Sequence, residues 1–265
     1  MHLISHFYNE EFLLPFWLKH HVPLFDHGIM VDYGSTDNSV DIIRELAPNW
    51  EIRKTRNKFF VEPQIGDEMM DIEQSIKGWK IILNTTEFIV HPDLRAYTKS
   101  LGDKKGICTT GVIMVDKKED REVALDPDRL LIDQKSWGYF EVDVLEKVST
   151  TGCQAFSRAR LLHQVPKGGY SIGRHINAVT KEQDPNLFLC WFGWSPFGQA
   201  GKDRKMQIQT KVNDKQRAIK QWAKCYVVDD KRLEEMYLEE EARSYNLLNN
   251  ARYAKAVQRF VCKEI

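Results

Sequence analysis

Residues 1–90 alternate short apolar runs with segments in which apolar residues recur at helical spacing. This alternation predicts a β-α-β-α-β-α-β order, which is typical of a mainly parallel sheet with helices on its faces. Ligands of such open sheets bind at the carboxyl edge, so we expect a site in the loops that follow the strands. The predicted strands cover 3–7, 28–32, 51–55 and 79–83, and the predicted helices cover 13–21, 40–47 and 67–77.

The pattern changes in the second half of the chain, where strands are predicted over 106–115 and 140–148. The aromatic and glycine-rich stretch 191–201 predicts an ordered loop, and helical periods dominate from residue 214 onward. No Pro/Gly/Ser-rich linker separates independent units. We therefore expect one α/β domain over residues 1–201 and a helical C-terminal extension over residues 202–265 that packs on it.

Composition excludes several classes of protein. The 265 residues include 38 Lys/Arg and 38 Asp/Glu, so the net charge gives no reason to expect nucleic acid as a partner. The five cysteines show no CxxC spacing, which predicts neither a disulfide scaffold nor a zinc site and is typical of a reducing compartment. The first strand starts at once, and no apolar run approaches the roughly 20 residues of a bilayer span. We expect a cytoplasmic protein that meets a membrane only from outside the lipid.

Polar residues cluster directly after three of the predicted strands. Asn9-Glu10-Glu11 follows the first strand, the run 32–39 follows the second, and the run 84–88 follows the fourth. An acidic first turn is favoured by the helix dipole whatever the function, so the first cluster alone is typical of a helix start. Parallel strands end at the same edge of a sheet, and we therefore expect the three clusters to lie together.

The run 32–39 reads Asp-Tyr-Gly-Ser-Thr-Asp-Asn-Ser. A strand-turn-helix with Ser35 or Asp37 as N-cap explains part of it. Capping does not explain Asp32 at the end of the strand. A carboxylate there can accept a hydrogen bond from a nucleobase, while Ser35 and the free N–H groups of the helix meet ribose or phosphate.

Three runs together, 7–11, 14–21 and 32–39, resemble family 2 glycosyltransferases. They are closest to the branch that carries an Asn-Glu, a Trp-Leu-x-x-His and an Asp-x-Gly-Ser-x-Asp in that order. The resemblance is strong over residues 1–95 and weaker beyond. It implies a GT-A fold, a nucleotide-sugar donor, usually a divalent metal such as Mn²⁺ or Mg²⁺, and inversion at the anomeric carbon. It also implies donor-binding roles, which we assign to Asn9, Glu10, Asp32, Ser35 and Asp37.

The metal motif of the family departs from its usual form in this chain. The expected Asp-x-Asp after the buried strand is replaced by Asn84-Thr85-Thr86, and only Glu87 keeps a charge. A hard divalent cation needs several oxygen ligands and carboxylate charge. Metal binding is then weak and assisted by the donor, or basic residues replace the metal, or transferase activity is lost. The alternative for Glu87 is an exposed carboxylate at a strand end, and we predict a metal or diphosphate role.

Two later segments supply further candidates. The glycine-rich run 168–175 ends in Arg174 and His175, which suit an anionic ligand, and the resemblance implies a metal or diphosphate role for His175. A structural histidine in a loop is the alternative. The aromatic stretch 191–197 followed by basic residues resembles the closing loop of the family, although it also suits a loop packed on the core. We assign its basic residues to the donor phosphates: Lys202, Arg204 and Lys205.

Inverting transfer needs a general base on the acceptor hydroxyl, usually Asp or Glu. We choose Asp133 from a set of acidic residues that the sequence does not separate: Asp126, Asp128, Asp133, Glu141 and Asp143.

The sequence thus predicts a transferase that moves a sugar from a nucleotide-sugar to a glycan, glycolipid or protein acceptor. A non-catalytic relative that binds a nucleotide or a glycan is the main alternative, because both aspartates of the metal motif are replaced. A methyltransferase should have a glycine-rich loop after the first strand, and residues 7–11 contain no glycine.

Overall fold

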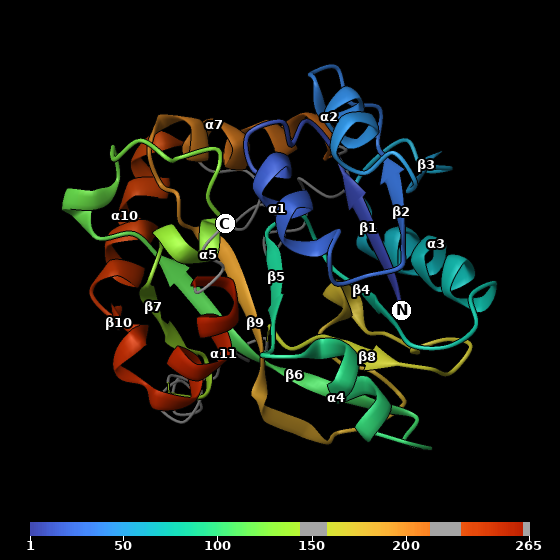
Figure 1. Cartoon of the computed structure of the whole chain (residues 1–265). Helices are drawn as coiled ribbons and strands as arrows, with labels where there is room; N and C mark the ends of the chain where they lie inside the picture. Colours follow the sequence, from blue (N-terminus) through green and yellow to red (C-terminus); the bar gives the residue numbers. More distant parts are fainter. Residues whose placement is uncertain (144–157, 213–228, 262–265) are drawn as a thin grey trace.

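The computed structural model describes residues 1–143, 158–212 and 229–261. Its strands form one mixed sheet, flanked by helices, as Figure 1 shows. In sheet order the strands are β10 (Tyr245–Asn246), β7 (Trp137–Phe140), β6 (Gly106–Val115), β8 (Leu161–His163), β4 (Lys80–Ile82), β1 (His2–Phe7), β2 (His27–Asp32) and β3 (Glu51–Lys54), while β9 (Gln183–Trp194) pairs with β6 and with β5 (Glu87–Val90).

The first half of the chain forms the predicted parallel unit. β4, β1, β2 and β3 are neighbours and all parallel, so the loops that follow them share one edge. The helices between and after the strands are α1 (Leu14–His21), α2 (Ser39–Leu46), α3 (Glu62–Gln74), α4 (Leu94–Ser100), α5 (Leu131–Gln134), α7 (Gln199–Gln207), α10 (Asp230–Glu241) and α11 (Ala251–Val261). This architecture confirms the predicted α/β class with a helical C-terminal part.

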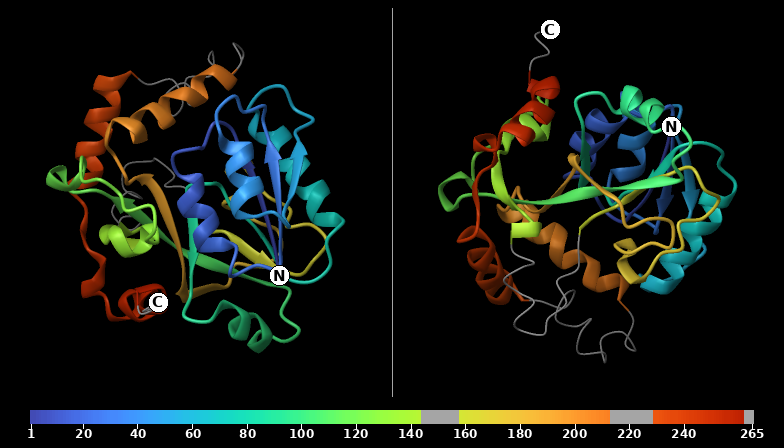
Figure 2. Two further views of the ribbon diagram at one scale, coloured as in Figure 1. Left: turned by 45° about the horizontal axis from the view of Figure 1, so that its top comes forward. Right: turned by 90° about the horizontal axis from the view of Figure 1, so that it is seen from below.

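Side chains alternate between two cores on the two faces of the sheet, because successive residues of a strand point in opposite directions. Leu3 and Met30 pack with α1 on one face, whereas Ile4 and Val31 pack against α3 on the other. In Figure 2, right, α1, α4 and α11 lie on one side of the sheet and α3 and α7 on the other. Parallel strands buried on both faces are expected to be apolar throughout, which explains the continuous apolar runs.

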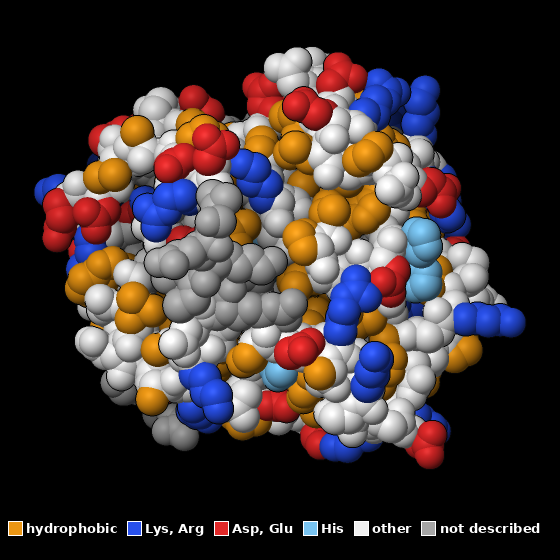
Figure 3. All heavy atoms as spheres, in the orientation of Figure 1, with side chains coloured by type: hydrophobic (Ala, Val, Ile, Leu, Met, Phe, Trp, Pro, Cys, Tyr) orange, Lys and Arg blue, Asp and Glu red, His pale blue; other side chains and the backbone are white. Residues whose placement is uncertain are grey.

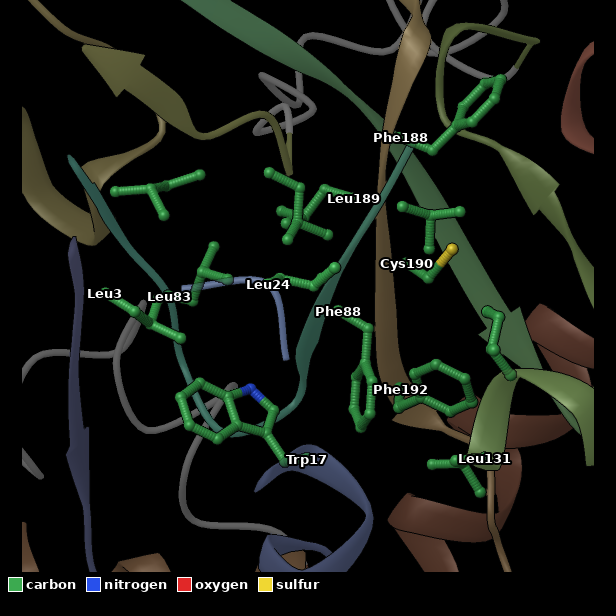
Figure 4. Close-up of a cluster of buried hydrophobic side chains, with 14 of the residues drawn as sticks. Leu3, Trp17, Leu24, Leu83, Phe88, Leu131, Phe188, Leu189, Cys190 and Phe192 are labelled. Carbon is green, nitrogen blue, oxygen red and sulfur yellow. The ribbon is translucent and has the colours of Figure 1, made fainter. Parts of the chain in front are cut away.

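The larger core holds the second half of the sheet against α1. Trp17 of α1 is fully buried, and its indole N–H donates to the Glu87 carbonyl at 2.9 Å. Figure 4 shows Trp17 pointing toward the strands, with Phe88 of β5 beside Phe192 of β9; the two phenyl centroids are 4.7 Å apart. Strand β5 is therefore anchored from the side opposite its Glu87 carboxylate.

Three predicted elements need correction. Residues 191–194 are the end of β9 and not a loop, because β9 is held by hydrogen bonds to β5 and to β6. Gly193 permits this in spite of its weak strand preference, since a Cβ there would lie 2.2 Å from the Trp191 indole that covers it. The strand predicted over 140–148 is β7, which ends at Phe140, and 144–148 lie outside the described residues.

The third correction concerns the helix predicted over 67–77. It is α3, displaced toward the N-terminus, where Pro63 suits the first turn. Of the predicted helices from residue 214 onward, α10 and α11 lie within the described ranges, with β10 between them. Tyr253, Ala256 and Val257 of α11 join the larger core. The predicted domain boundary after residue 201 falls inside α7.

No helix within residues 1–143, 158–212 and 229–261 is both long and apolar enough to span a membrane. On the described part of the face in Figure 3, basic and acidic side chains are interspersed.

Candidate functional site

The loops after β1 and β2 interlock through hydrogen bonds from backbone N–H groups to side chains. The Asn9 N–H donates to Ser35 Oγ at 3.1 Å, and the Thr36 N–H donates to Asn9 Oδ1 at 2.8 Å. The Glu10 N–H donates to Ser39 Oγ at 2.8 Å. Asn9 adopts a positive φ of 50°, a conformation that asparagine tolerates better than most residues. The predicted donor-binding loops are therefore adjacent and mutually supported.

Two carboxylates complete this loop pair. Asp32 Oδ1 accepts hydrogen bonds from the N–H groups of Gly34 at 3.0 Å and Ser35 at 2.8 Å. Asp37 accepts from the N–H groups of Glu11 and Ser39, both at 3.0 Å. Asp32 thus shapes the turn with one oxygen, and the side chain stays partly exposed at the end of β2.

Three basic residues of α7 point to three different partners. Lys202 pairs with Glu234 of α10 at 2.8 Å. Arg204 donates from Nε and from its terminal nitrogen to the two carboxylate oxygens of Glu10, at 2.6 and 2.8 Å. This second pair joins residues 194 positions apart and docks α7 on the loop after β1.

Lys205 makes a different kind of contact. Its ammonium lies 3.7 Å from the centroid of the Trp194 ring and 5.4 Å from that of Trp191. Burial, together with the charges of Arg204 and Arg158, lowers its pKa to about 7, while the Glu240 carboxylate opposes this shift. An approaching anion would therefore stabilise the charged form of this ammonium group.

The carboxylate of Glu87 is fully buried and not exposed. Arg160 Nε donates to Glu87 Oε2 at 2.9 Å, its second nitrogen contacts Oε1, and the Asn84 N–H donates to Oε2 at 2.7 Å. In this ion pair the side chains are 0% exposed for Glu87 and 2% exposed for Arg160. The one charge that the metal motif retains is neutralised by an arginine.

Arg174 and His175 lie against the same pair. Arg174 is buried and donates to Asn84 Oδ1 at 2.7 Å, and Arg160 contacts His175 Nδ1 at 3.1 Å. Burial lowers the pKa of His175 well below its usual value, and the nearby arginines Arg160, Arg158 and Arg174 act in the same direction. His175 is thus a neutral imidazole next to cationic groups. The structure brings Glu87, Arg174 and His175 together, as predicted for one site.

These residues do not fit a divalent cation. Among the described residues no group of three or more His, Cys, Asp or Glu side chains is placed to hold a metal. The positions of the two motif aspartates carry Asn84 and Thr86, and Glu87 is occupied by a guanidinium. A metal here would face Arg160 and Arg174 without the anionic oxygens that offset its dehydration.

Asp133 lies apart from this cluster. It belongs to α5, which contacts α1 and α11 on the opposite face of the sheet from α3. Its Oδ1 is buried with no hydrogen-bond partner among the described residues, and burial raises the pKa of its carboxyl group. No described contact joins Asp133 to Glu87 or Arg160.

Among the other predicted bases, Glu141 contacts the segment that carries Arg158. Its carboxylate accepts from the Arg158 N–H, and a Cβ on Gly111 of β6 would lie 2.6 Å from its Oε2.

Sequence reasoning missed Arg158 and Arg160, which precede β8. The guanidinium of Arg158 lies 3.9 Å from the centroid of the Trp191 ring. Trp191 is paired with Glu87 in the antiparallel β5–β9 register, and directly opposed residues project from the same face. The Arg-Ala-Arg alternation at 158–160, which predicts two side chains on one face of an extended segment, was the available signal.

No known family model matches the chain, and no curated protein matches it. Several solved structures are similar to this chain. The structure of residues 1–349 of S. aureus TarS is 9% identical over 95% of this chain and 72% of that chain, with a TM-score of 0.41. The TarS complex with UDP-GlcNAc is 16% identical over 47% of this chain and 36% of that one, with a TM-score of 0.33.

Glucosyl-3-phosphoglycerate synthase from Mycobacterium tuberculosis with Mn²⁺ and UDP-glucose is also similar. It is 14% identical over 62% of this chain and 55% of that chain, with a TM-score of 0.35. In this comparison and in the TarS–UDP-GlcNAc one, the matched part is less than two thirds of the other protein's length. The likeness is partial, and residue roles in this chain rest on its own contacts.

Proposed function

We propose that this chain is a GT-A-type glycosyltransferase that moves a sugar from a nucleotide-sugar donor to an acceptor hydroxyl with inversion. One observation carries the proposal. The three polar clusters of the glycosyltransferase-like sequence pattern follow β1, β2 and β4, which are adjacent parallel strands. The pattern and the sheet edge where ligands bind therefore coincide.

In this proposal the loops after β1 and β2 hold the nucleoside. Asp32 contacts the base through the oxygen that the turn leaves available, and Asn9, Ser35 and Asp37 keep the loops in place. Glu10 acts through Arg204, which it orients by two hydrogen bonds. Lys202 is assigned to the pairing with α10, because its ammonium lies 2.8 Å from the Glu234 carboxylate.

The reaction needs a base that removes the proton of the acceptor hydroxyl as its oxygen attacks the anomeric carbon. The bond from that carbon to the diphosphate oxygen breaks at the same time, and its electron pair leaves with the nucleoside diphosphate. Asp133 is the base predicted from the sequence, and burial raises the pKa of its carboxyl group, but it lies apart from the Glu87–Arg160 pair. Glu141 is the second candidate, since its carboxylate adjoins Arg158. We infer a glycan, glycolipid or protein acceptor and a cytoplasmic location.

The second candidate function is non-catalytic binding of a nucleotide or a glycan. The buried Glu87–Arg160 pair favours it, because the carboxylate of the metal motif is paired with an arginine and is not available to a metal ion.

A panel of UDP-, GDP-, CMP- and dTDP-sugars separates the two functions. We expect one nucleotide to raise the melting temperature, since ligand at 100 times its dissociation constant adds about 2.7 kcal/mol of stability. Release of the nucleotide (UDP, GDP or dTDP, or CMP from a CMP-sugar) in the presence of an acceptor library supports the transferase. A shift without release, for every acceptor tried, supports the binding protein. No shift with any nucleotide contradicts both nucleotide-dependent functions.

A further inference from the structure

A nucleoside diphosphate carries several negative charges, and the leaving group gains more as the glycosidic bond breaks. A site that handles it needs cations that are not already neutralised. Three basic groups at this edge have a carboxylate partner: Arg160 pairs with Glu87, Arg204 with Glu10, and Lys202 with Glu234. These pairs organise the site but have little charge left to offer an anion.

Arg158 and Lys205 differ from this group. Within the described residues neither the Arg158 guanidinium nor the Lys205 ammonium has a carboxylate within ion-pair distance. Both contact aromatic rings instead: Arg158 lies 3.9 Å from the Trp191 centroid, and Lys205 lies 3.7 Å from the Trp194 centroid. An indole face attracts a cation without neutralising its charge. The two tryptophans therefore hold two cations whose positive charge remains available to an anion.

The positions of these two cations fit a donor diphosphate. Trp191, which both contact, is opposite Glu87 in the register of β5 and β9 and projects from the same face. On the other side, Arg204 next to Lys205 is tied to Glu10 in the loop after β1. The two cations are thus linked through Trp191 to the strand that carries Glu87, and through the neighbouring Arg204 to the loop after β1.

We propose that Arg158 and Lys205, supported by Trp191 and Trp194, form a metal-independent site for the donor diphosphate, with Arg160 in place of a cation at Glu87. This inference rests on the proposed function. Phosphate oxygens accept hydrogen bonds from guanidinium and ammonium groups, and the negative charge that develops on the departing oxygen is neutralised by the protein itself. The depressed pKa of Lys205 agrees with this role, because a bound anion recovers the free energy that burial costs the ammonium.

The test measures the dissociation constants of UDP and of uridine by calorimetry, in EDTA and in Mn²⁺. A different nucleotide replaces this pair if the donor panel selects another base. Two variants are compared with the parent: Lys205→Met, which keeps an apolar chain against the indoles, and Arg158→Gln. Lys99→Met, at an exposed position on α4, is the matched control for loss of one positive charge. Melting temperatures verify that each variant is folded.

We expect UDP to bind equally well in EDTA and in Mn²⁺. Each variant should weaken UDP binding about tenfold or more, as for loss of a charged hydrogen bond, and leave uridine binding unchanged. Lys99→Met should behave like the parent.

Two results overturn the inference and leave the proposed function standing: UDP binding that requires Mn²⁺, and equal weakening of UDP and uridine by the variants. Absence of binding by every nucleoside diphosphate overturns the proposed function, and the inference with it.

Discussion

Replacement of Glu87 by glutamine tests whether this residue is a structural ion-pair partner or a metal ligand. The Glu87 carboxylate accepts from Arg160 Nε at 2.9 Å, from the second Arg160 nitrogen and from the Asn84 N–H at 2.7 Å. Glutamine has one acceptor oxygen, and its NH₂ group would face donors. Because the pair is almost completely buried, the guanidinium would be left without a counter-charge.

Removal of one partner from a buried ion pair costs about 3–5 kcal/mol. At about 2–4 °C per kcal/mol for a chain of this size, the melting temperature should fall by about 6–20 °C. Urea unfolding should give the same loss in the free energy of unfolding. The double variant Glu87→Gln/Arg160→Met should lose less than the sum of the two single variants, since it removes both charges.

Glu119→Gln, at an exposed position, is the control and should stay within about 0.5 kcal/mol of the parent. Equal stability of Glu87→Gln and this control would contradict a structural ion pair at Glu87. So would a variant that retains its fold but loses a stabilisation by Mn²⁺ that the parent displays.

Three further predictions concern the loops and α7. Arg204→Met should lower the free energy of unfolding by about 1–3 kcal/mol, because the Glu10 carboxylate loses its charged donor, and should speed hydrogen exchange in α7; unchanged exchange would contradict the docking role. Lys205 has a pKa of about 7 in the folded state and 10.5 as its ordinary value, so the unfolded chain binds more protons between these values and stability should rise with pH there. UDP affinity should fall as pH rises through about 7, and a pH profile shared by Lys205→Met would refute the assignment. Asp32→Asn retains the acceptor for the two loop N–H groups, so it should keep the melting temperature of the parent but weaken donor binding about tenfold in calorimetry. Asp32→Ala should lower both the melting temperature and the donor affinity. Equal donor affinity of the parent and Asp32→Asn would remove Asp32 from the base-binding role.

The order of elements in the first half of the chain could be predicted because it depends on local spacing. The two faces of β1 and β2 and the stripe of α1 are determined by neighbours within a few residues of each other. The positions of the polar clusters then followed from the rule that parallel strands end at one edge. For the same reason the loops that carry Asn9 and Asp32 are adjacent in the structure.

The chemistry of Glu87 could not be predicted in this way. Its partner Arg160 is 73 residues further along the chain, and no local pattern marks the pair. The same holds for Trp191 to Trp194, where glycine and aromatic content suggested a loop. Their strand conformation comes from pairing with β5 and β6, a tertiary effect that overrides local preference.

The three basic side chains of α7 have a consequence for how this fold can be divided. A polypeptide ended at residue 201 would keep all strands of the parallel unit, yet it would lose the arginine that orients Glu10 and the lysine above the tryptophans. It would also lack both Lys202 and α10, whose Glu234 pairs with that lysine. The candidate site therefore depends on residues after 201, and replacing the C-terminal part would also remove a contact of the loop after β1.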